Sequence, residues 1–271
     1  MRCPEAASRR ELARWTRLAL RELGARPRRG LGQSFLVDPA PLRRYEELIP
    51  WGSRVYEPGP GLGVLTCLLS RLSSRVASVE LDRRLAEWLV QLFDSRPNVL
   101  VIHADAVALS GLVAADVLAS NLPYSAASQI LVSAVQNNSI RLVVAMLQLE
   151  VARRITSRPG SRAYGRLSAV LRMYFSAEID SIYPPSSFYP PPKVYSSLTV
   201  LRRVREWRDR DKCFLELARC LFTWPNRLAS KAFRACGVQP PPGAEGVRVR
   251  QLPPSAIYEA AMSSPGCGGG S

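Results

Sequence analysis

The feature that most constrains the fold is an apolar strand that runs into a glycine-rich turn and then into a helical pattern. The strand at residues 55–57 leads into the turn Pro58-Gly59-Pro60-Gly61-Leu62-Gly63. A second strand, at residues 75–80, ends in Glu80, 21 residues after Gly59. Glycines let backbone approach a ligand closely, and an acid at this spacing binds ribose hydroxyls in nucleotide-binding folds. The spacing predicts an open α/β sheet with a nucleoside site.

Two further strand ends carry polar side chains. A third strand, at residues 99–102, leads to Asp105, and a fourth, at residues 116–120, ends at Asn121. In open α/β sheets, ligands bind at the carboxyl ends of the strands. Either acid taken singly is about as well explained as a helix N-cap. The ordered set instead favours a nucleoside-bearing cofactor with its ribose at Glu80 and its adenine amine at Asp105.

The segment Asn121-Leu122-Pro123-Tyr124 suits methylation of an exocyclic base amine. Such an amine is a poor nucleophile, so its site needs neutral oxygens that accept the amine protons and a flat surface for the base. Proline lacks an N–H, which leaves nearby carbonyls free to accept. On these four residues alone, a plain strand ending in a proline turn is the simpler interpretation. The upstream strand ends favour the functional one.

The ordered motifs resemble those of the small-subunit ribosomal RNA adenine dimethyltransferases. The resemblance is colinear from about residue 31 to 201 and rests on Leu31-Gly32-Gln33-Ser34-Phe35-Leu36, the glycine turn, Glu80, Asp105, Asn121-Leu122-Pro123-Tyr124 and Phe188-Tyr189-Pro190-Pro191-Pro192-Lys193-Val194. It implies a seven-stranded Rossmann-like methyltransferase sheet with helices on both faces. It also implies S-adenosylmethionine as methyl donor and two adjacent adenosines, in a hairpin near the 3′ end of small-subunit RNA, as acceptors.

The resemblance also implies roles for individual residues. Cofactor contacts fall on Ser34, Leu36, Gly59, Glu80, Asp105 and Asn121. The catalytic segment is Asn121, Leu122, Pro123 and Tyr124, with Tyr124 and Phe188 stacking on a base extruded from the RNA. No oxyanion forms during methyl transfer to an amine, so no metal is expected. Ser34 departs from the family's usual Asn or His, and residues 223–231 depart from its usual basic cluster.

Charge points to a polyanionic partner. The net charge is +15 and the isoelectric point is near 10.3, with 34 arginines among 37 basic residues. Arginine dominance also fits a compositional bias of the genome. One cluster lies before the first motif, at Arg26, Arg28 and Arg29, and another is expected to bind RNA, at Arg153, Arg154, Arg158 and Arg162. The expected partner is small-subunit ribosomal RNA, or the immature small subunit, bound by a monomer.

The chain divides by pattern into two domains. Residues 1–204 are expected to form the catalytic domain, with a fifth strand at 140–147 and the last two strands at 167–175 and 197–204. An amphipathic helix is expected at 11–23. Residues 205–271 are expected to form a small helical RNA-binding domain, with helices near 214–222 and 255–262 and a loose tail.

Cysteine spacing and hydropathy complete these expectations. The six cysteines lie far apart without a Cys-x-x-Cys pair, so neither a zinc site nor a disulfide framework is expected. Cys213 and Cys220 are seven residues apart and are expected to share one helical face as residues of the hydrophobic core. No apolar run approaches a membrane span, and no secretory segment begins the chain. We therefore expect a cytoplasmic protein that does not contact membranes.

Three alternatives stay open at this point. An enzyme of the same fold could act on large-subunit RNA, which substrate mapping would reveal. An assembly or transcription factor could keep the fold and bind nucleic acid without catalysis, although the intact set of Glu80, Asp105 and Asn121 argues against it. A nicotinamide-dependent oxidoreductase is suggested by the glycine turn alone, and calorimetry with each cofactor would test it.

Overall fold

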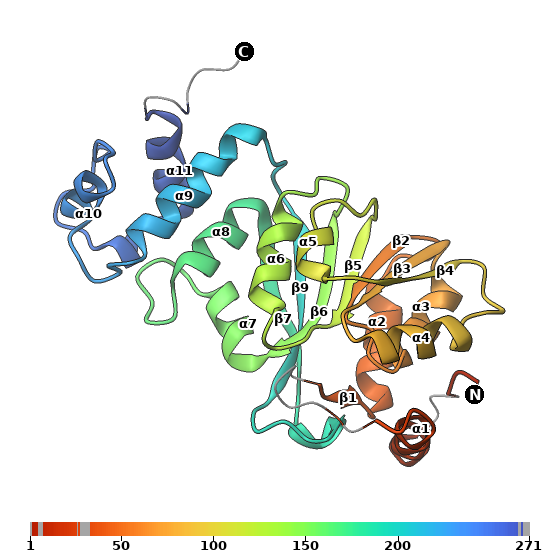
Figure 1. Ribbon diagram of the computed structural model, residues 1–271. Helices are drawn as coiled ribbons and strands as arrows, with labels where there is room; N and C mark the ends of the chain where they lie inside the picture. The colour runs from red at the N-terminus through yellow and green to blue at the C-terminus, as the bar shows by residue number, and fades with distance from the viewer. Residues whose placement is uncertain (1, 5–7, 26, 28–32, 265–266, 268–271) are drawn as a thin grey trace. The chain divides into compact units, whose positions relative to one another are not determined.

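The structure is a computed structural model that describes residues 2–4, 8–25, 27, 33–264 and 267 (Figure 1). Its helices are α1 (Arg9–Glu22), α2 (Pro39–Leu48), α3 (Val64–Leu72), α4 (Arg83–Leu92), α5 (Ala106–Leu109), α6 (Ala127–Val135), α7 (Leu149–Thr156), α8 (Arg166–Tyr174), α9 (Lys212–Leu221), α10 (Ala229–Ala235) and α11 (Pro254–Met262). Its strands are β1 (Phe35–Leu36), β2 (Arg54–Pro58), β3 (Arg75–Glu80), β4 (Val99–His103), β5 (Val117–Asn121), β6 (Leu142–Gln148), β7 (Phe175–Tyr183), β8 (Phe188–Tyr189) and β9 (Ser196–Arg203).

The main sheet has seven strands in the order β4-β3-β2-β5-β6-β9-β7. Strands β2 to β6 pair in parallel, and β9 pairs antiparallel to β6. The chain leaves β2 for β3 on one side and later returns to place β5 on the other side. This reversal makes a topological switch point between β2 and β5, where α/β sheets bind their ligands. The predicted seven-stranded sheet is confirmed.

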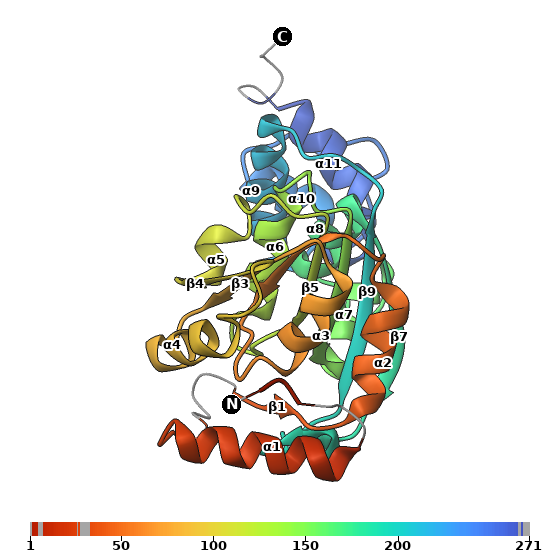
Figure 2. The same ribbon diagram turned by 90° about the vertical axis from the view of Figure 1, so that its right-hand side faces the viewer.

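Helices cover both faces of the sheet because alternate strand residues point to opposite sides. On one side Val55, Val76 and Val117 belong to a buried cluster that takes in apolar residues of α1 to α4. On the other side the Tyr56 hydroxyl donates to the Ala106 carbonyl at the start of α5 (2.9 Å). Figure 2, turned by 90° from Figure 1, shows α1 running beside the small β1 element.

The chain forms two compact units. Unit 1 comprises Met1–Ala152 and Glu178–Arg202, and unit 2 comprises Arg153–Ala177 and Arg203–Ser271. In unit 2, α8 packs against α9 and α11, and the Tyr174 ring contacts Phe214 on α9 and Trp207 in the loop after β9. The chain passes from unit 1 to unit 2 for the second time between residues 202 and 203, beside the domain boundary predicted at residue 204. The prediction did not place α8 in the same unit as the C-terminal helices. The catalytic and RNA-binding roles of the two parts stay predictions.

One predicted strand is wrong. Residues 167–175 were expected as a strand, but they lie almost entirely in α8, and the strand follows as β7. The apolar residues Val170, Leu171 and Tyr174 recur at a spacing of three to four and bury one face of a helix. The Ser168 hydroxyl accepts from the Gly165 backbone N–H (3.1 Å) and so caps the helix start. The strands at β6 and β9, and helices α1, α9 and α11, agree with prediction.

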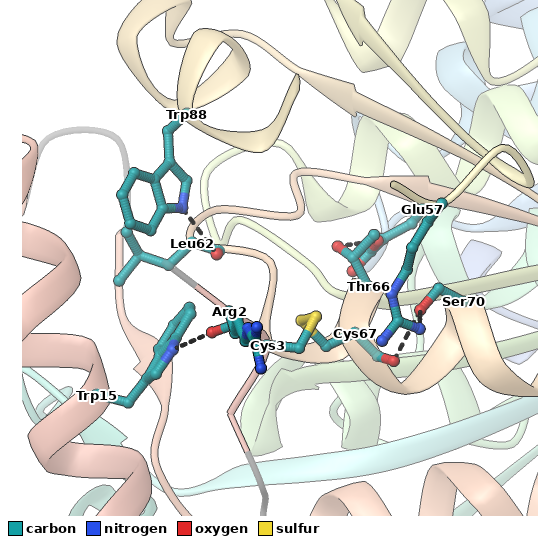
Figure 3. Close-up of a disulfide and its surroundings, with 10 residues drawn as sticks. Arg2, Cys3, Trp15, Glu57, Leu62, Thr66, Cys67, Ser70 and Trp88 are labelled. Carbon is teal, nitrogen blue, oxygen red and sulfur yellow. Dashed lines mark hydrogen bonds between the residues drawn. A yellow bond between two sulfur atoms is a disulfide. The ribbon is translucent and has the colours of Figure 1, made fainter. Parts of the chain in front are cut away.

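The expectation of no disulfide framework is also wrong. Cysteine pairs 3–67, 213–267 and 220–236 are disulfide-bonded, with Cα–Cα distances of 5.7, 6.1 and 6.0 Å. Spacing along the chain could not show this, because each pair is brought together only by the fold. Cys3–Cys67 ties the N-terminal segment to α3 (Figure 3). Helix α9 carries one cysteine of each of the other two pairs. Cys213 and Cys220 are therefore cross-linked residues of that helix rather than free core thiols.

In the described residues no helix is both long enough and apolar enough to cross a bilayer. The arginine cluster at positions 26, 28 and 29 lies outside the described residues.

Candidate active site

A cavity lies in unit 1 at the carboxyl ends of β2, β3 and β5. The empty space within it, counted out to its open mouth, is about 1070 Å³. All six residues expected to contact the cofactor line it: Ser34, Leu36, Gly59, Glu80, Asp105 and Asn121. Leu122, Pro123 and Tyr124 line it as well. The fold thus gathers the ordered strand ends around a single cavity.

The glycine turn forms the cavity floor between β2 and α3. Gly59, Gly61 and Gly63 have φ values of 69°, 61° and 89°, in the left-handed region that favours glycine. The Gly59 backbone N–H donates to the Val79 carbonyl (2.8 Å), which fixes the turn to β3. A Cβ built on Gly59 would lie 2.8 Å from Pro123 Cγ, so the turn is in close contact with the Asn121-Leu122-Pro123-Tyr124 segment.

We expect Gly59→Ala to weaken cofactor binding by at least about tenfold, because the methyl group both strains the backbone and pushes on Pro123. The matched control is Gly52→Ala, whose φ is 78° but whose Cβ meets nothing within 4 Å. Calorimetric titration with S-adenosylmethionine measures the difference. Equal losses in the two variants would mean that general destabilisation of the fold, rather than the contact of Gly59 with Pro123, weakens binding.

Glu80 and Asp105 are held by backbone donors. The Glu80 carboxylate is 7% exposed and accepts from the backbone N–H groups of Gly61 and Asp82, both at 3.0 Å. Burial raises the pKa of Glu80, and these hydrogen bonds oppose that rise. Asp105 caps α5 by accepting from the Val107 backbone N–H through Oδ1 (2.8 Å). Asp105 is therefore both an N-cap and a cavity residue, two interpretations that the sequence had set against each other.

The amide of Asn121 is oriented by one hydrogen bond. Its Nδ2 donates to the Ser34 backbone carbonyl (2.9 Å). Within the described residues no hydrogen bond reaches Asn121 Oδ1, so this oxygen is available as an acceptor in the cavity. The Pro123 carbonyl accepts from the N–H groups of Ala126 and Ala127 at the start of α6. Of the Leu122 and Pro123 backbone carbonyls, that of Leu122 is thus the better placed to accept from a substrate.

Tyr124 and the Ser34 segment form the adjoining wall. The Tyr124 hydroxyl forms a hydrogen bond with the Ser196 hydroxyl on β9 (2.7 Å), which anchors the tyrosine ring. Burial raises the pKa of Tyr124. The Ser34 hydroxyl donates to the Pro190 carbonyl (2.8 Å). Ser34 therefore contributes its hydroxyl to the packing of the β8 segment and its carbonyl to Asn121.

Phe188 is buried outside the cavity, whereas a residue that stacks on the substrate base should be accessible from it. It pairs with Leu36 in the β1–β8 ladder, is 2% exposed and belongs to the hydrophobic cluster. It does not line the cavity. Its proposed stacking on the base stays a prediction, and it requires this segment to move.

The four arginines expected to bind RNA, Arg153, Arg154, Arg158 and Arg162, are all exposed. The first two lie on α7, and the others lie in the turns that follow it, within unit 2. Exposure agrees with contact to RNA phosphates, and the assignment stays a prediction.

The sequence analysis does not single out Glu57 as a residue of the site, although Glu57 directly precedes the glycine turn. Glu57 lies near the end of β2, is 1% exposed and lines the cavity. Its signal in the sequence is a carboxylate just before the glycine turn, at the end of a strand that is otherwise apolar.

The switch point, the glycine turn and the acids at successive strand ends define a nucleoside-cofactor protein of the Rossmann-like methyltransferase class. The profile of the family described as "Ribosomal RNA adenine dimethylase" matches residues 24–235. The chain belongs to this family, which confirms the resemblance seen in the motifs.

Individual relatives agree with this assignment. The chain is 39% identical over 205 residues to a probable ribosomal RNA small subunit methyltransferase A of Aeropyrum pernix, covering 74% of this chain and 73% of the relative. It is 33% identical to the ribosomal RNA small subunit methyltransferase A of Geobacter metallireducens, covering 82% and 91%.

Two solved structures share the fold. A dimethyladenosine transferase from Plasmodium falciparum superposes with a TM-score of 0.68 at 21% identity, covering 83% of this chain and 95% of that one. The 23S rRNA methyltransferase ErmE superposes with a TM-score of 0.58 at 26% identity, covering 84% and 99%.

Proposed function

We propose that this protein transfers methyl groups from S-adenosylmethionine to the N6 amines of adenosines in small-subunit ribosomal RNA. Family membership and relatives named for the small subunit support the reaction and the substrate class. The observation that carries the proposal is the cavity itself, where Asn121-Leu122-Pro123-Tyr124 lines the same space as Gly59, Glu80 and Asp105.

The charge of the cavity fits this methyl donor. Among the lining residues that the structure describes there are three carboxylates, Glu57, Glu80 and Asp105, and no lysine, arginine or histidine. This contrasts with a chain whose net charge is +15. S-adenosylmethionine carries a net positive charge and no phosphate, whereas nicotinamide dinucleotides carry phosphates that such a cavity repels. The cavity therefore argues against the oxidoreductase alternative.

The residues that line the cavity would bind the donor on one side and the substrate base on the other. Glu80 would hold the ribose hydroxyls and Asp105 the adenine amine of the donor. When bound, the donor supplies an electrophilic methyl group on a sulfonium. Asn121 Oδ1 and the Leu122 carbonyl would accept hydrogen bonds from the substrate amine and stabilise the positive charge that develops on its nitrogen. Tyr124 would stack on the base, worth about 1–3 kcal/mol, which offsets much of the cost of unstacking it.

The finer target belongs to the same proposal. We place the modified adenosines as two adjacent residues of a hairpin near the 3′ end of the small-subunit RNA, presented by an immature subunit to a monomeric enzyme. Exposed Arg153, Arg154, Arg158 and Arg162 would bind its phosphates. We propose the cytoplasm as the compartment of the enzyme, because the immature small subunit is its proposed substrate.

The test is transfer of labelled methyl groups to immature small subunits, followed by nucleoside analysis. We expect N6,N6-dimethyladenosine in small-subunit RNA and no label in large subunits offered in parallel. Label confined to the large subunit would establish the alternative substrate. Binding of RNA without any label would favour a non-catalytic assembly factor.

A further inference from the structure

Glu57 is a buried residue of the cavity wall. It lies near the end of β2 and accepts hydrogen bonds from the hydroxyls of Thr66 on α3 (2.6 Å) and Ser78 on β3 (2.9 Å). Figure 3 shows the side chains of Thr66 and Glu57 turned toward each other. Thr66 directly precedes Cys67, which is bonded to Cys3. One helix side chain and one strand side chain, both fully buried, therefore fix the orientation of this acid.

Both hydroxyls donate to the same oxygen, Oε2. In the part of the chain that the structure describes, no hydrogen bond reaches the other oxygen, Oε1. Among the described residues, this oxygen is not one of the fully enclosed side-chain atoms that lack a partner, so it stays accessible to a group in the cavity. Because Glu57 lines the cavity, the group that can contact this oxygen is a ligand in that cavity.

The surroundings of Glu57 contain no compensating cation among the described residues. The charged or titratable groups that act on it are Glu80 from β3 and the Tyr45 phenol from α2. Burial, and to a lesser degree repulsion by Glu80, raises the pKa of Glu57 to about 7, against the opposing effect of the two hydroxyls. The charge of this acid is consequently sensitive to pH near neutrality.

We propose that Glu57 makes the cavity selective for the cationic methyl donor over its neutral demethylated product. The proposal rests on the proposed function, because it concerns the charge change of that reaction. In methyl transfer the sulfur–carbon bond breaks, a nitrogen–carbon bond forms and the positive charge passes from sulfur to the amine, which then loses a proton. The spent cofactor keeps its amino-acid zwitterion but its sulfur becomes a neutral thioether, so the attraction of the sulfonium to Glu57 is lost when the methyl group has been transferred.

The sign of the pH dependence follows from this charge change. A cation in the cavity favours the ionised carboxylate and lowers the pKa of Glu57, so donor binding near pH 7 releases a fraction of a proton. Donor affinity should rise as pH increases through about 7 and level off above it. Product affinity should change little over the same range. Glu57 thus helps the enzyme to retain the donor and to release the product.

The test is calorimetric titration of the wild type and Glu57→Gln with S-adenosylmethionine and with S-adenosylhomocysteine. Titrations at about pH 6, 7 and 8, in buffers of different ionisation enthalpy, also count released protons. We expect Glu57→Gln to reduce the preference for donor over product by about tenfold, the effect of one favourable charge interaction of moderate strength, and to abolish proton release. The matched control is Glu87→Gln, an exposed acid on α4 that pairs with Arg83, which should change neither.

A second variant protects the test against misfolding of Glu57→Gln. Ser78→Ala removes one hydroxyl that favours the ionised acid, so it should shift the pH midpoint of donor binding upward. An unchanged midpoint, or a Glu57→Gln variant that weakens donor and product equally, would overturn the role of Glu57 and leave the enzymatic function intact. A wild type that binds neither compound would instead contradict the proposed function.

Discussion

Asn121→Ala is expected to reduce methyl transfer by on the order of 10²–10³-fold or more, while the affinity for S-adenosylmethionine falls only several-fold. The substitution removes Oδ1, the side-chain acceptor that faces the cavity, and so removes stabilisation of the charge that develops on the amine. It also removes the 2.9 Å bond to the Ser34 carbonyl, worth about 1 kcal/mol. The second loss is small because the Ser34 hydroxyl still binds the Pro190 carbonyl.

Single-turnover transfer to small-subunit RNA, with calorimetry in parallel, separates the two effects. Gln91→Ala is the matched control, because it deletes an exposed amide on α4 and should leave both quantities unchanged. A normal single-turnover rate in Asn121→Ala would sink the catalytic assignment. A loss of cofactor binding as large as the loss of rate would make Asn121 a binding residue only.

Reduction of the three disulfides is expected to lower the melting temperature by at least about 10 °C. The bridges close loops with sequence separations of 64, 54 and 16 residues. In the chain-entropy account such loops stabilise the folded state by about 4, 4 and 3 kcal/mol. Two of the bridges lie in unit 2, so the effect should be largest there.

Thermal unfolding with and without a reductant measures the total. The double variant Cys220→Ala/Cys236→Ala should lose the least, because its loop is the shortest, and Cys3→Ala/Cys67→Ala should lose more. A variant lacking all six cysteines controls for effects of the reductant itself. An unchanged melting temperature on complete reduction would show that the bridges add nothing to stability.

The sequence could predict the site because its residues follow strand ends. The carboxyl ends of parallel strands meet at one edge of a sheet, so Gly59, Glu80, Asp105 and Asn121 had to converge once the strands were recognised. The strand predicted at residues 167–175 is wrong because it rests on the apolar content of this segment. The spacing of its apolar residues is that of a helix.

Other features depend on contacts between residues far apart in the chain. The partner of Cys3 is 64 residues away, and the burial of Phe188 depends on its pairing with Leu36. The unpartnered oxygen of Glu57 arises because two hydroxyls, one from a helix and one from a strand, meet on the other oxygen. No local pattern encodes such coincidences, so these features become visible only in three dimensions.

The discontinuity of unit 2 sets a rule for protein engineering. Helix α8 rests on α9 and α11, and the ring of Tyr174 lies 5.7 Å from that of Trp207 and 6.1 Å from that of Phe214. Truncation of the chain after residue 202 would strip these partners away and leave an apolar helix face prone to aggregation. Chimaeras that exchange the C-terminal part between relatives should therefore transplant residues 153–177 together with residues 203–271, as one folding module written in two pieces of the gene.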